Sequence, residues 1–160
     1  MEEDEIVQED DYQKGLFLTF RIANEDFGLE IRYVTEIIGI QKITEVPDMP
    51  PFVRGVINLR GKVIPVMDIR LRFGMPSREY DERTCIVVVK VDQKSVGLVV
   101  DKVNEVANIQ DGQIEPPPVS GHALSNNYIK GMGKIDEEVK ILLDVQRLLF
   151  QDGDEEFPVG

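Results

Sequence analysis

The sequence has very little of the chemistry that catalysis and metal binding usually need. It contains no tryptophan, a single cysteine (Cys85) and a single histidine (His122). One cysteine excludes an internal disulfide and a thiolate metal cluster, and one histidine is too few for an ordinary zinc or di-metal site. We therefore expect no metal and no cofactor, and we interpret Cys85 as a small, buried strand residue.

Excess positive charge and long apolar runs are also missing. The chain has 30 acidic against 18 basic residues, a net charge of −12, which argues against nucleic-acid binding. No apolar run approaches the roughly 20 residues of a membrane-spanning helix, and the acidic start is unlike a signal peptide. These absences predict a soluble cytoplasmic protein that neither binds nucleic acid nor inserts into a membrane.

The negative charge is concentrated at the two ends of the chain. Residues 1–11 contain seven acidic residues and residues 151–160 contain four, with no basic residue in either segment. Between them, 19 acidic residues face all 18 basic residues, so the middle of the chain is almost neutral. Such segments usually remain solvated. We expect disordered acidic tails over 1–13 and 151–160, which mainly aid solubility, and one folded domain over 14–150.

The folded part contains an internal repeat. Residues 16–38 match residues 85–107 at a shift of 69, and residues 52–70 match residues 128–146 at a shift of 76. The matches keep the same order along the chain, and the longer shift in the second half adds seven residues to one loop. The sequence therefore contains two copies of one small unit.

Within each copy the apolar residues alternate along short segments that end at turn residues. Residues 16–22 alternate in this way, as expected of a half-buried strand. Residues 53–59 and 62–67 predict a hairpin whose turn contains Gly61. Five short strands in each copy favour a small barrel, so we expect a mostly β fold of two subdomains with short helices. Their expected bounds are about 14–75 and 83–150.

Candidate catalytic features are weak. Two glycine-lysine stretches, residues 55–63 and 131–135, lack the spacing and the strand-to-helix context of a phosphate-binding loop. His122 lies in a Ser-Gly-His loop and is most simply an exposed loop residue. An enzyme that uses His122 in a groove between the barrels stays open as an alternative.

A binding surface is the stronger prediction. Val34, Glu36 and Ile38 alternate along one predicted strand, so we expect their side chains to point the same way. Arg60 lies at a hairpin tip, where its guanidinium could pair with a carboxylate or simply remain solvated. Two barrels packed together would also leave a groove at their seam, where binding is favoured.

The central hairpin resembles a known family. Residues 52–70, which read FVRGVINLRGKVIPVMDIR, closely resemble the CheW family of bacterial chemotaxis coupling proteins, and residues 27–37 and 96–103 are similar to it too. The resemblance covers about residues 14–150. It implies two SH3-like five-stranded β-barrels and an adaptor without catalysis. Its implied partners are the tip of a chemoreceptor's helical hairpin and the regulatory domain of the histidine kinase CheA.

The resemblance also implies which residues make these contacts. Together with the strand pattern, it predicts that receptor or kinase binding involves Val34, Glu36, Ile38, Arg60, Val99, Val103 and Val106. Three matching glycines are predicted to serve either the fold or the contact: Gly55, Gly97 and Gly131.

One departure from the family concerns a second kinase contact. Some members carry a basic residue and an aromatic residue where this chain has Glu115 and Ser120. We therefore expect that contact to be absent or built differently. A CheW-like adaptor of another chemosensory pathway, such as gliding or twitching motility, remains an alternative.

Overall fold

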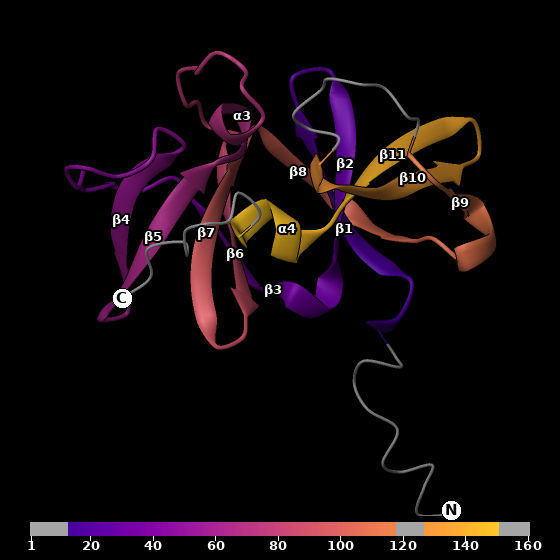
Figure 1. Ribbon diagram of the computed structural model, residues 1–160, viewed down its shortest axis with the longest axis horizontal. Helices are drawn as coiled ribbons and strands as arrows, with labels where there is room; N and C mark the ends of the chain where they lie inside the picture. Colours follow the sequence, from indigo (N-terminus) through magenta and orange to yellow (C-terminus); the bar gives the residue numbers. More distant parts are fainter. Residues whose placement is uncertain (1–12, 118–126, 151–160) are drawn as a thin grey trace, which may run out of the picture.

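The structure is a computed structural model that describes residues 13–117 and 127–150 (Figure 1). The predicted tails, apart from residue 13, lie outside these residues, as do Ser120 and His122. The first half contains β1 (Leu16–Ile22), β2 (Glu25–Glu30), the 3-10 helix η1 (Ile31–Tyr33), β3 (Val34–Gly39), β4 (Val53–Leu59), β5 (Lys62–Asp68) and the short helix α3 (Ile69–Arg72).

The second half repeats the five strands and the final helix of the first half in the same order. It contains β6 (Cys85–Val91), β7 (Lys94–Val100), β8 (Lys102–Asn108), the 3-10 helix η2 (Asp111–Gln113), β9 (Ile114–Glu115), β10 (Ile129–Ile135), β11 (Glu138–Leu143) and α4 (Val145–Phe150). Strands β6, β7, β8, β10 and β11 and helix α4 therefore correspond to β1–β5 and α3. The predicted repeat is confirmed, with β9 as an addition in the longer loop of the second copy.

Each of the two sheets contains strands from both copies. The six-stranded sheet has the order β8-β1-β2-β11-β10-β9, and the five-stranded sheet has the order β3-β6-β7-β5-β4. Each sheet takes the first two strands of one copy and the later strands of the other copy. Parallel pairing of β2 with β11 and of β5 with β7 joins the copies. The two copies, over about 14–75 and 83–150, therefore each contribute strands to both sheets.

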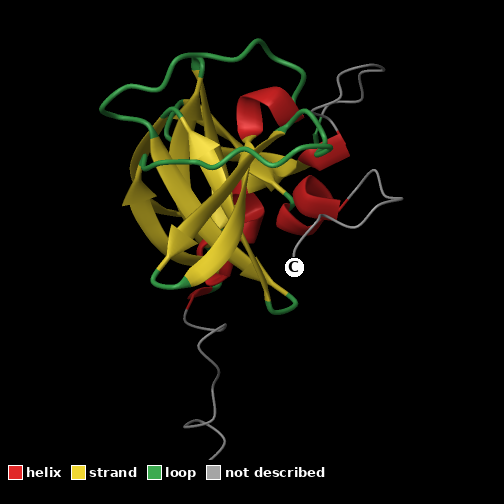
Figure 2. Ribbon diagram, turned by 90° about the vertical axis from the view of Figure 1, so that its left-hand side faces the viewer, coloured by secondary structure: helices red, strands yellow, loops and turns green. Residues whose placement is uncertain are grey.

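The strands nearer the viewer in Figure 2 form a strongly curved sheet, but the hydrogen-bonded ladders of both sheets stay open. Among the described residues, no ladder joins β3 to β4 or β8 to β9. The gap beside β4 is bridged by the segment that follows β3. There the Thr44 amide donates to the Val56 carbonyl at 2.8 Å, and the Val56 amide donates to the Thr44 carbonyl at 2.9 Å.

Three apolar clusters fill the molecule. The largest lies between the two sheets and includes Phe20 and Val89 together with Leu148 of α4, which runs between the sheets in Figure 1. Smaller clusters fill the curve of each sheet, around Ile64 in the five-stranded sheet and around Phe17 in the six-stranded sheet. Strands β1 and β6 are consequently buried on both faces. The expected half-buried strand at 16–22 is wrong, because its second face lines a barrel interior.

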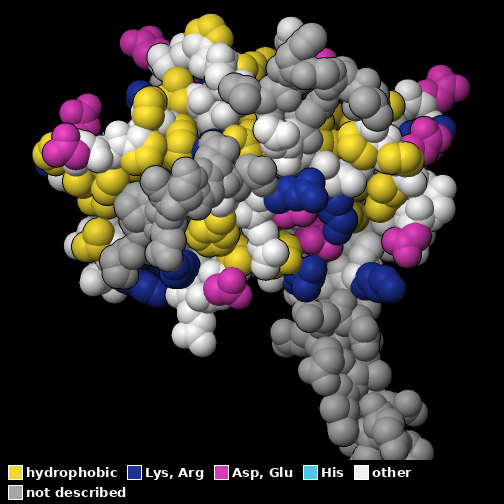
Figure 3. All heavy atoms as spheres, in the orientation of Figure 1, with side chains coloured by type: hydrophobic (Ala, Val, Ile, Leu, Met, Phe, Trp, Pro, Cys, Tyr) yellow, Lys and Arg dark blue, Asp and Glu magenta, His cyan; other side chains and the backbone are white. Residues whose placement is uncertain are grey.

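The charged side chains of both signs lie among apolar ones on the face seen in Figure 3. No helix of the described residues is long and apolar enough to cross a membrane.

Candidate functional site

Strand β3 carries a bulge that changes which side chains share a face. Val34 pairs with Val89, but Glu36 pairs with the adjacent Val88, so β3 has one residue more than its partner at this point. The Thr35 hydroxyl donates to the Val88 carbonyl at 3.1 Å. A bulge of this kind re-aims the side chains that follow it.

The bulge separates the three predicted residues of β3. Val34 packs against the cluster between the sheets, whereas Ile38 packs against the cluster inside the five-stranded sheet. Glu36 lies opposite Val88, which belongs to that second cluster. The expectation that Val34, Glu36 and Ile38 face the same way is therefore wrong, because the extra residue breaks the alternation.

Ile37, and not Ile38, shares a face of β3 with Val34. It lies opposite Val87, a residue of the cluster between the sheets, and 42% of its surface is exposed. Sequence reasoning missed Ile37, although the repeat carried the signal. The shift of 69 residues places Ile37 on Val106, which was predicted as a contact residue.

The same bulge recurs in β8. Val106 pairs with Leu18 and Val103 pairs with Phe20. The two pairs are three residues apart on β8 but only two apart on β1, so β8 has one extra residue at this point. Thr19 fills the gap in the ladder, since its hydroxyl donates to the Glu105 carbonyl at 2.7 Å. Val106 is 52% exposed, and Val103 is half-buried against the cluster between the sheets. Both strands lie at a sheet edge, so each copy presents an exposed apolar residue there.

Arg60 and Glu36 are brought together by the fold. Arg60 and Gly61 form the tip of the β4-β5 hairpin with positive φ values of 53° and 86°, and the Gly61 amide donates to Asn58 Oδ1 at 2.8 Å. The Arg60 guanidinium donates to the Glu36 carboxylate across the open side of the five-stranded sheet. The Arg60 side chain remains 70% exposed. These two predicted residues therefore form one charged surface feature.

Val99 does not belong to this surface. It is 3% exposed and packs with Ile57, Ile64 and Val66 inside the five-stranded sheet. A side chain enclosed in this way offers nothing to a partner, so we assign Val99 to the core.

The three predicted glycines serve the fold. A Cβ atom on Gly55, whose φ is +144°, would lie 2.1 Å from the Thr44 carbonyl oxygen. A Cβ atom on Gly97 would lie 2.7 Å from Ile86 Cγ2, and one on Gly131 would lie 2.7 Å from Ile114 Cγ2. Gly55 therefore allows the Thr44 segment to bridge β4, and all three glycines allow close strand contacts.

Asp101 holds the junction between the sheets. Burial raises the pKa of this carboxyl, but hydrogen bonds from Arg70 and the Ala23 amide outweigh it and keep the pKa below its usual value. Arg70 Nε and Nη2 donate to Asp101 at 3.0 Å and 2.7 Å, and Arg78 Nη1 donates to it at 3.0 Å. Asp101 thereby ties β1, α3 and the segment between the copies to one point.

Catalytic features stay weak in the described part of the chain. Within residues 13–117 and 127–150, no group of three His, Cys, Asp or Glu side chains could hold a metal ion. Cys85 is half-buried, and burial raises the pKa of its thiol, which disfavours the reactive thiolate. The Glu115 carboxylate accepts a hydrogen bond from Lys134 Nζ at 2.7 Å, so it is already paired within the protein.

Comparison with known proteins gives a consistent result. A family model described as the CheW-like domain matches residues 16–152. The chain is 38% identical to chemotaxis protein CheW of Klebsiella aerogenes, over 83% of this chain and 80% of that protein. It is 32% identical to chemotaxis protein CheW of Helicobacter pylori, over 91% and 87% of the two chains.

A solved structure extends the likeness to the fold. The crystal structure of the scaffolding protein TtCheW from Thermoanaerobacter tengcongensis superposes with a TM-score of 0.82 at 35% identity. The match covers 91% of this chain and 99% of that one. On the family match, the sequence identity and the shared fold, this chain belongs to the CheW family of non-catalytic chemotaxis scaffolding proteins.

Proposed function

We propose that this chain is the adaptor that couples the cytoplasmic tip of a chemoreceptor to the regulatory domain of the histidine kinase CheA. The observation that carries the proposal is the pair of exposed apolar residues, Ile37 and Val106, on corresponding edge strands, with the Arg60–Glu36 pair beside one of them. Together with family membership, this arrangement supports a protein that works by binding. We place it in the cytoplasm, recruited to membrane-associated receptor arrays.

The two parts of this surface suit different partners. Ile37 with Val34, and Val106 with Val103, offer apolar contacts of the kind that receive the apolar face of a helix, which fits a receptor hairpin. The Arg60–Glu36 pair offers a directed polar contact on a hairpin tip, which fits the surface of a folded kinase domain. Contacts made by only a few side chains give modest affinities, and an array that presents many such contacts at once would strengthen the binding.

Titration calorimetry tests the proposal. The full chain is titrated with a CheA regulatory domain and, separately, with a receptor-tip fragment. We expect saturable heat with both partners, and we expect Ile37→Asp to weaken the receptor titration far more than the kinase titration. Val139→Asp is the matched control, because Val139 is 47% exposed on β11, away from both edge strands.

Each outcome has a defined meaning. Absence of binding to several CheA domains and receptor tips would reject the coupling function and move the chain to another chemosensory pathway, such as gliding or twitching motility. Loss of coupling in a folded His122→Ala variant would instead revive the enzyme alternative.

A further inference from the structure

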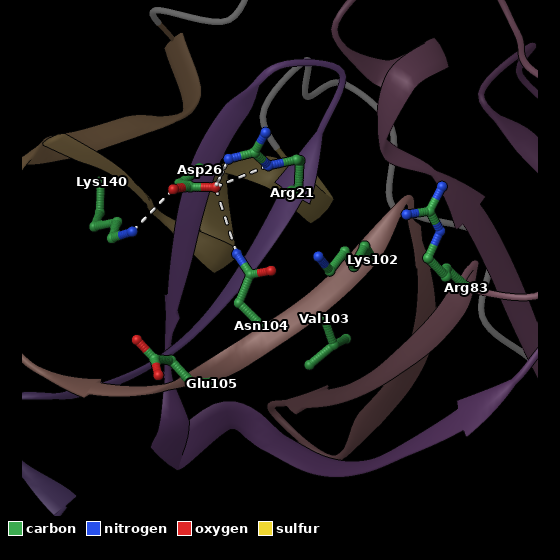
Figure 4. A pocket seen from close by; sticks show the side chains of 8 residues that line it. All are labelled: Arg21, Asp26, Arg83, Lys102, Val103, Asn104, Glu105 and Lys140. Carbon is green, nitrogen blue, oxygen red and sulfur yellow. Dashed lines mark hydrogen bonds and ion pairs between the residues drawn. The ribbon is translucent and has the colours of Figure 1, made fainter. Parts of the chain in front are cut away.

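A charged pocket opens at one end of the barrel formed by the six-stranded sheet. Its volume is about 520 Å³. The charges gather from four strands and from the segment before β6 (Figure 4). The side chains that matter here are Arg21, Asp26, Arg83, Lys102, Asn104 and Lys140. Four of these six are cations, in a chain whose net charge is −12. Counting Glu105, which also lines it, the pocket holds four positive and two negative side chains.

One wall of the pocket is fixed by a hydrogen-bond network around Asp26. Lys140 Nζ donates to Asp26 Oδ2 at 2.9 Å, and Arg21 Nε donates to Asp26 Oδ1 at 3.2 Å. The Asn104 amide also donates to Asp26 Oδ1, at 3.4 Å. Burial opposes ionisation of Asp26 and Lys140, but their mutual contact lowers the pKa of Asp26 and raises that of Lys140. Both groups therefore stay charged at neutral pH and hold the wall in one arrangement.

Arg83 and Lys102 add positive charge to the pocket beyond the Asp26 network. Within residues 13–117 and 127–150, the side chains of Arg83 and Lys102 form no ion pair. Lys102 lies beside Arg21, its register partner across β1 and β8, and Arg83 lies at the side of the pocket away from Lys140 (Figure 4). The backbone at Arg83 is nevertheless held, because its amide donates to Asp81 Oδ1 at 2.8 Å. Two exposed cations therefore lie in a concave site, where field lines concentrate.

The internal repeat supplies a comparison inside the same molecule. At the shifts of 69 and 76 residues, Asp26 corresponds to Ser95, and Lys140 corresponds to Ile64. Ile64 is 3% exposed and belongs to the apolar cluster of the five-stranded sheet. The barrel of the five-stranded sheet therefore has no counterpart of the Asp26–Lys140 ion pair, although Lys90 there corresponds to Arg21. The Asp26–Lys140 ion pair is therefore particular to the barrel of the six-stranded sheet, and an apolar residue at the position of Lys140 would avoid its desolvation cost.

We propose that this pocket binds the carboxylate groups of an acidic segment on a protein partner. The cations come from separate elements around an open rim, which suits several side-chain carboxylates better than one enclosed small anion. Val103 borders the pocket and lies on β8 with the exposed Val106, so a bound segment could continue onto apolar surface. The proposal does not require that the partner be CheA or a chemoreceptor.

Chemical-shift titration of the isotope-labelled full chain with a blocked hexaglutamate peptide tests this site. We expect amide shifts to cluster at residues 21, 26, 83, 102–105 and 140 at low salt, and to shrink as ionic strength rises. The double variant Arg83→Glu/Lys102→Glu should bind the peptide at least tenfold more weakly, since it reverses the two unpaired cations. The control Lys42→Glu/Lys90→Glu makes the same charge change at exposed sites outside the pocket and should bind like the parent.

Four results would overturn the proposal. Absence of shifts at the pocket would reject the site. Equal weakening by both double variants would show general electrostatic attraction. Inorganic phosphate that displaces the peptide at the same residues with equal affinity would make it a small-anion site. A peptide of residues 1–12 that binds there in preference to hexaglutamate would assign the pocket to the chain's own acidic segment. None of these results bears on binding to CheA, which the calorimetric titrations report separately.

Discussion

Reversing the charge of Arg60 separates a role in binding from a role in the fold. In the variant Arg60→Glu, two carboxylates would face each other where the Arg60–Glu36 ion pair now lies. The Arg60 side chain is 70% exposed, and exposed pairs contribute on the order of 0.5 kcal/mol to stability. The variant should therefore melt only about 2 °C below the parent.

The expected loss in binding is larger. Reversing a charge in a contact places like charges together and costs on the order of 2 kcal/mol or more, which corresponds to a roughly 30-fold weaker Kd for the CheA regulatory domain. The assay is titration calorimetry beside thermal unfolding of the same samples. Arg60→Asn is the first control, because asparagine accepts the positive φ of 53° at this position and removes the guanidinium without reversing the charge. Lys62→Glu, on the same hairpin, is the second.

The charge swap Glu36→Arg/Arg60→Glu distinguishes two roles of the ion pair. Either the two side chains contact the partner directly, or their ion pair only keeps the hairpin tip in place. The swap restores an ion pair within the protein, so stability should return to that of the parent. Binding should stay weak if each side chain meets a complementary charge on the partner. Recovery of binding in the swapped variant, or unchanged affinity of Arg60→Glu for both partners, would refute the direct contact.

Three further predictions concern the fold. Gly55→Ala should lower the free energy of unfolding by about 3 kcal/mol or more in urea titrations, because its Cβ would meet the Thr44 carbonyl oxygen at 2.1 Å. The control Gly61→Ala has open space around its Cβ and should lower the free energy of unfolding by only about 1–2 kcal/mol. Arg72→Ala should cost about 3 kcal/mol, because Arg72 lies over the rings of Phe52 and Tyr128 and donates to the Leu148 carbonyl; a smaller loss than in Arg147→Ala would contradict this. Asp101 has a pKa below its ordinary 3.8, so the stability that it contributes is present above pH 3.8 and is lost as pH falls below that value. The stability of Asp101→Asn should accordingly fall less steeply with acid than that of the parent, and parallel acid titrations would count against the role of Asp101.

Local patterns were enough to place most of the elements. The alternation in residues 16–22 and the Gly61 turn predict β1 and the β4-β5 hairpin, because strand and turn preferences depend on neighbouring residues. The repeat predicts that the second half follows the same order, and the structure confirms it. The resemblance of residues 52–70 correctly indicated the family, since that run carries the hairpin and its turn.

The candidate site was only partly predictable. Arg60 was expected to meet a carboxylate, but nothing local indicates that this carboxylate is Glu36, from a strand at the opposite edge of the same sheet. Val99 was expected at a contact, yet strand alternation does not reveal that both faces of its strand are buried. Ile37 was missed because a one-residue bulge reverses the alternation after it.

The order of strands and turns, the two copies and the near-neutral middle of the chain can all be read from the sequence, because local patterns of residues specify them. Long-range packing sets three further features: the copies exchange strands, Ile37 is exposed, and one pocket is lined by Arg21, Lys102, Arg83 and Lys140. Strand pairing across copies depends on which distant apolar faces are buried together, and this is a property of the whole packed chain.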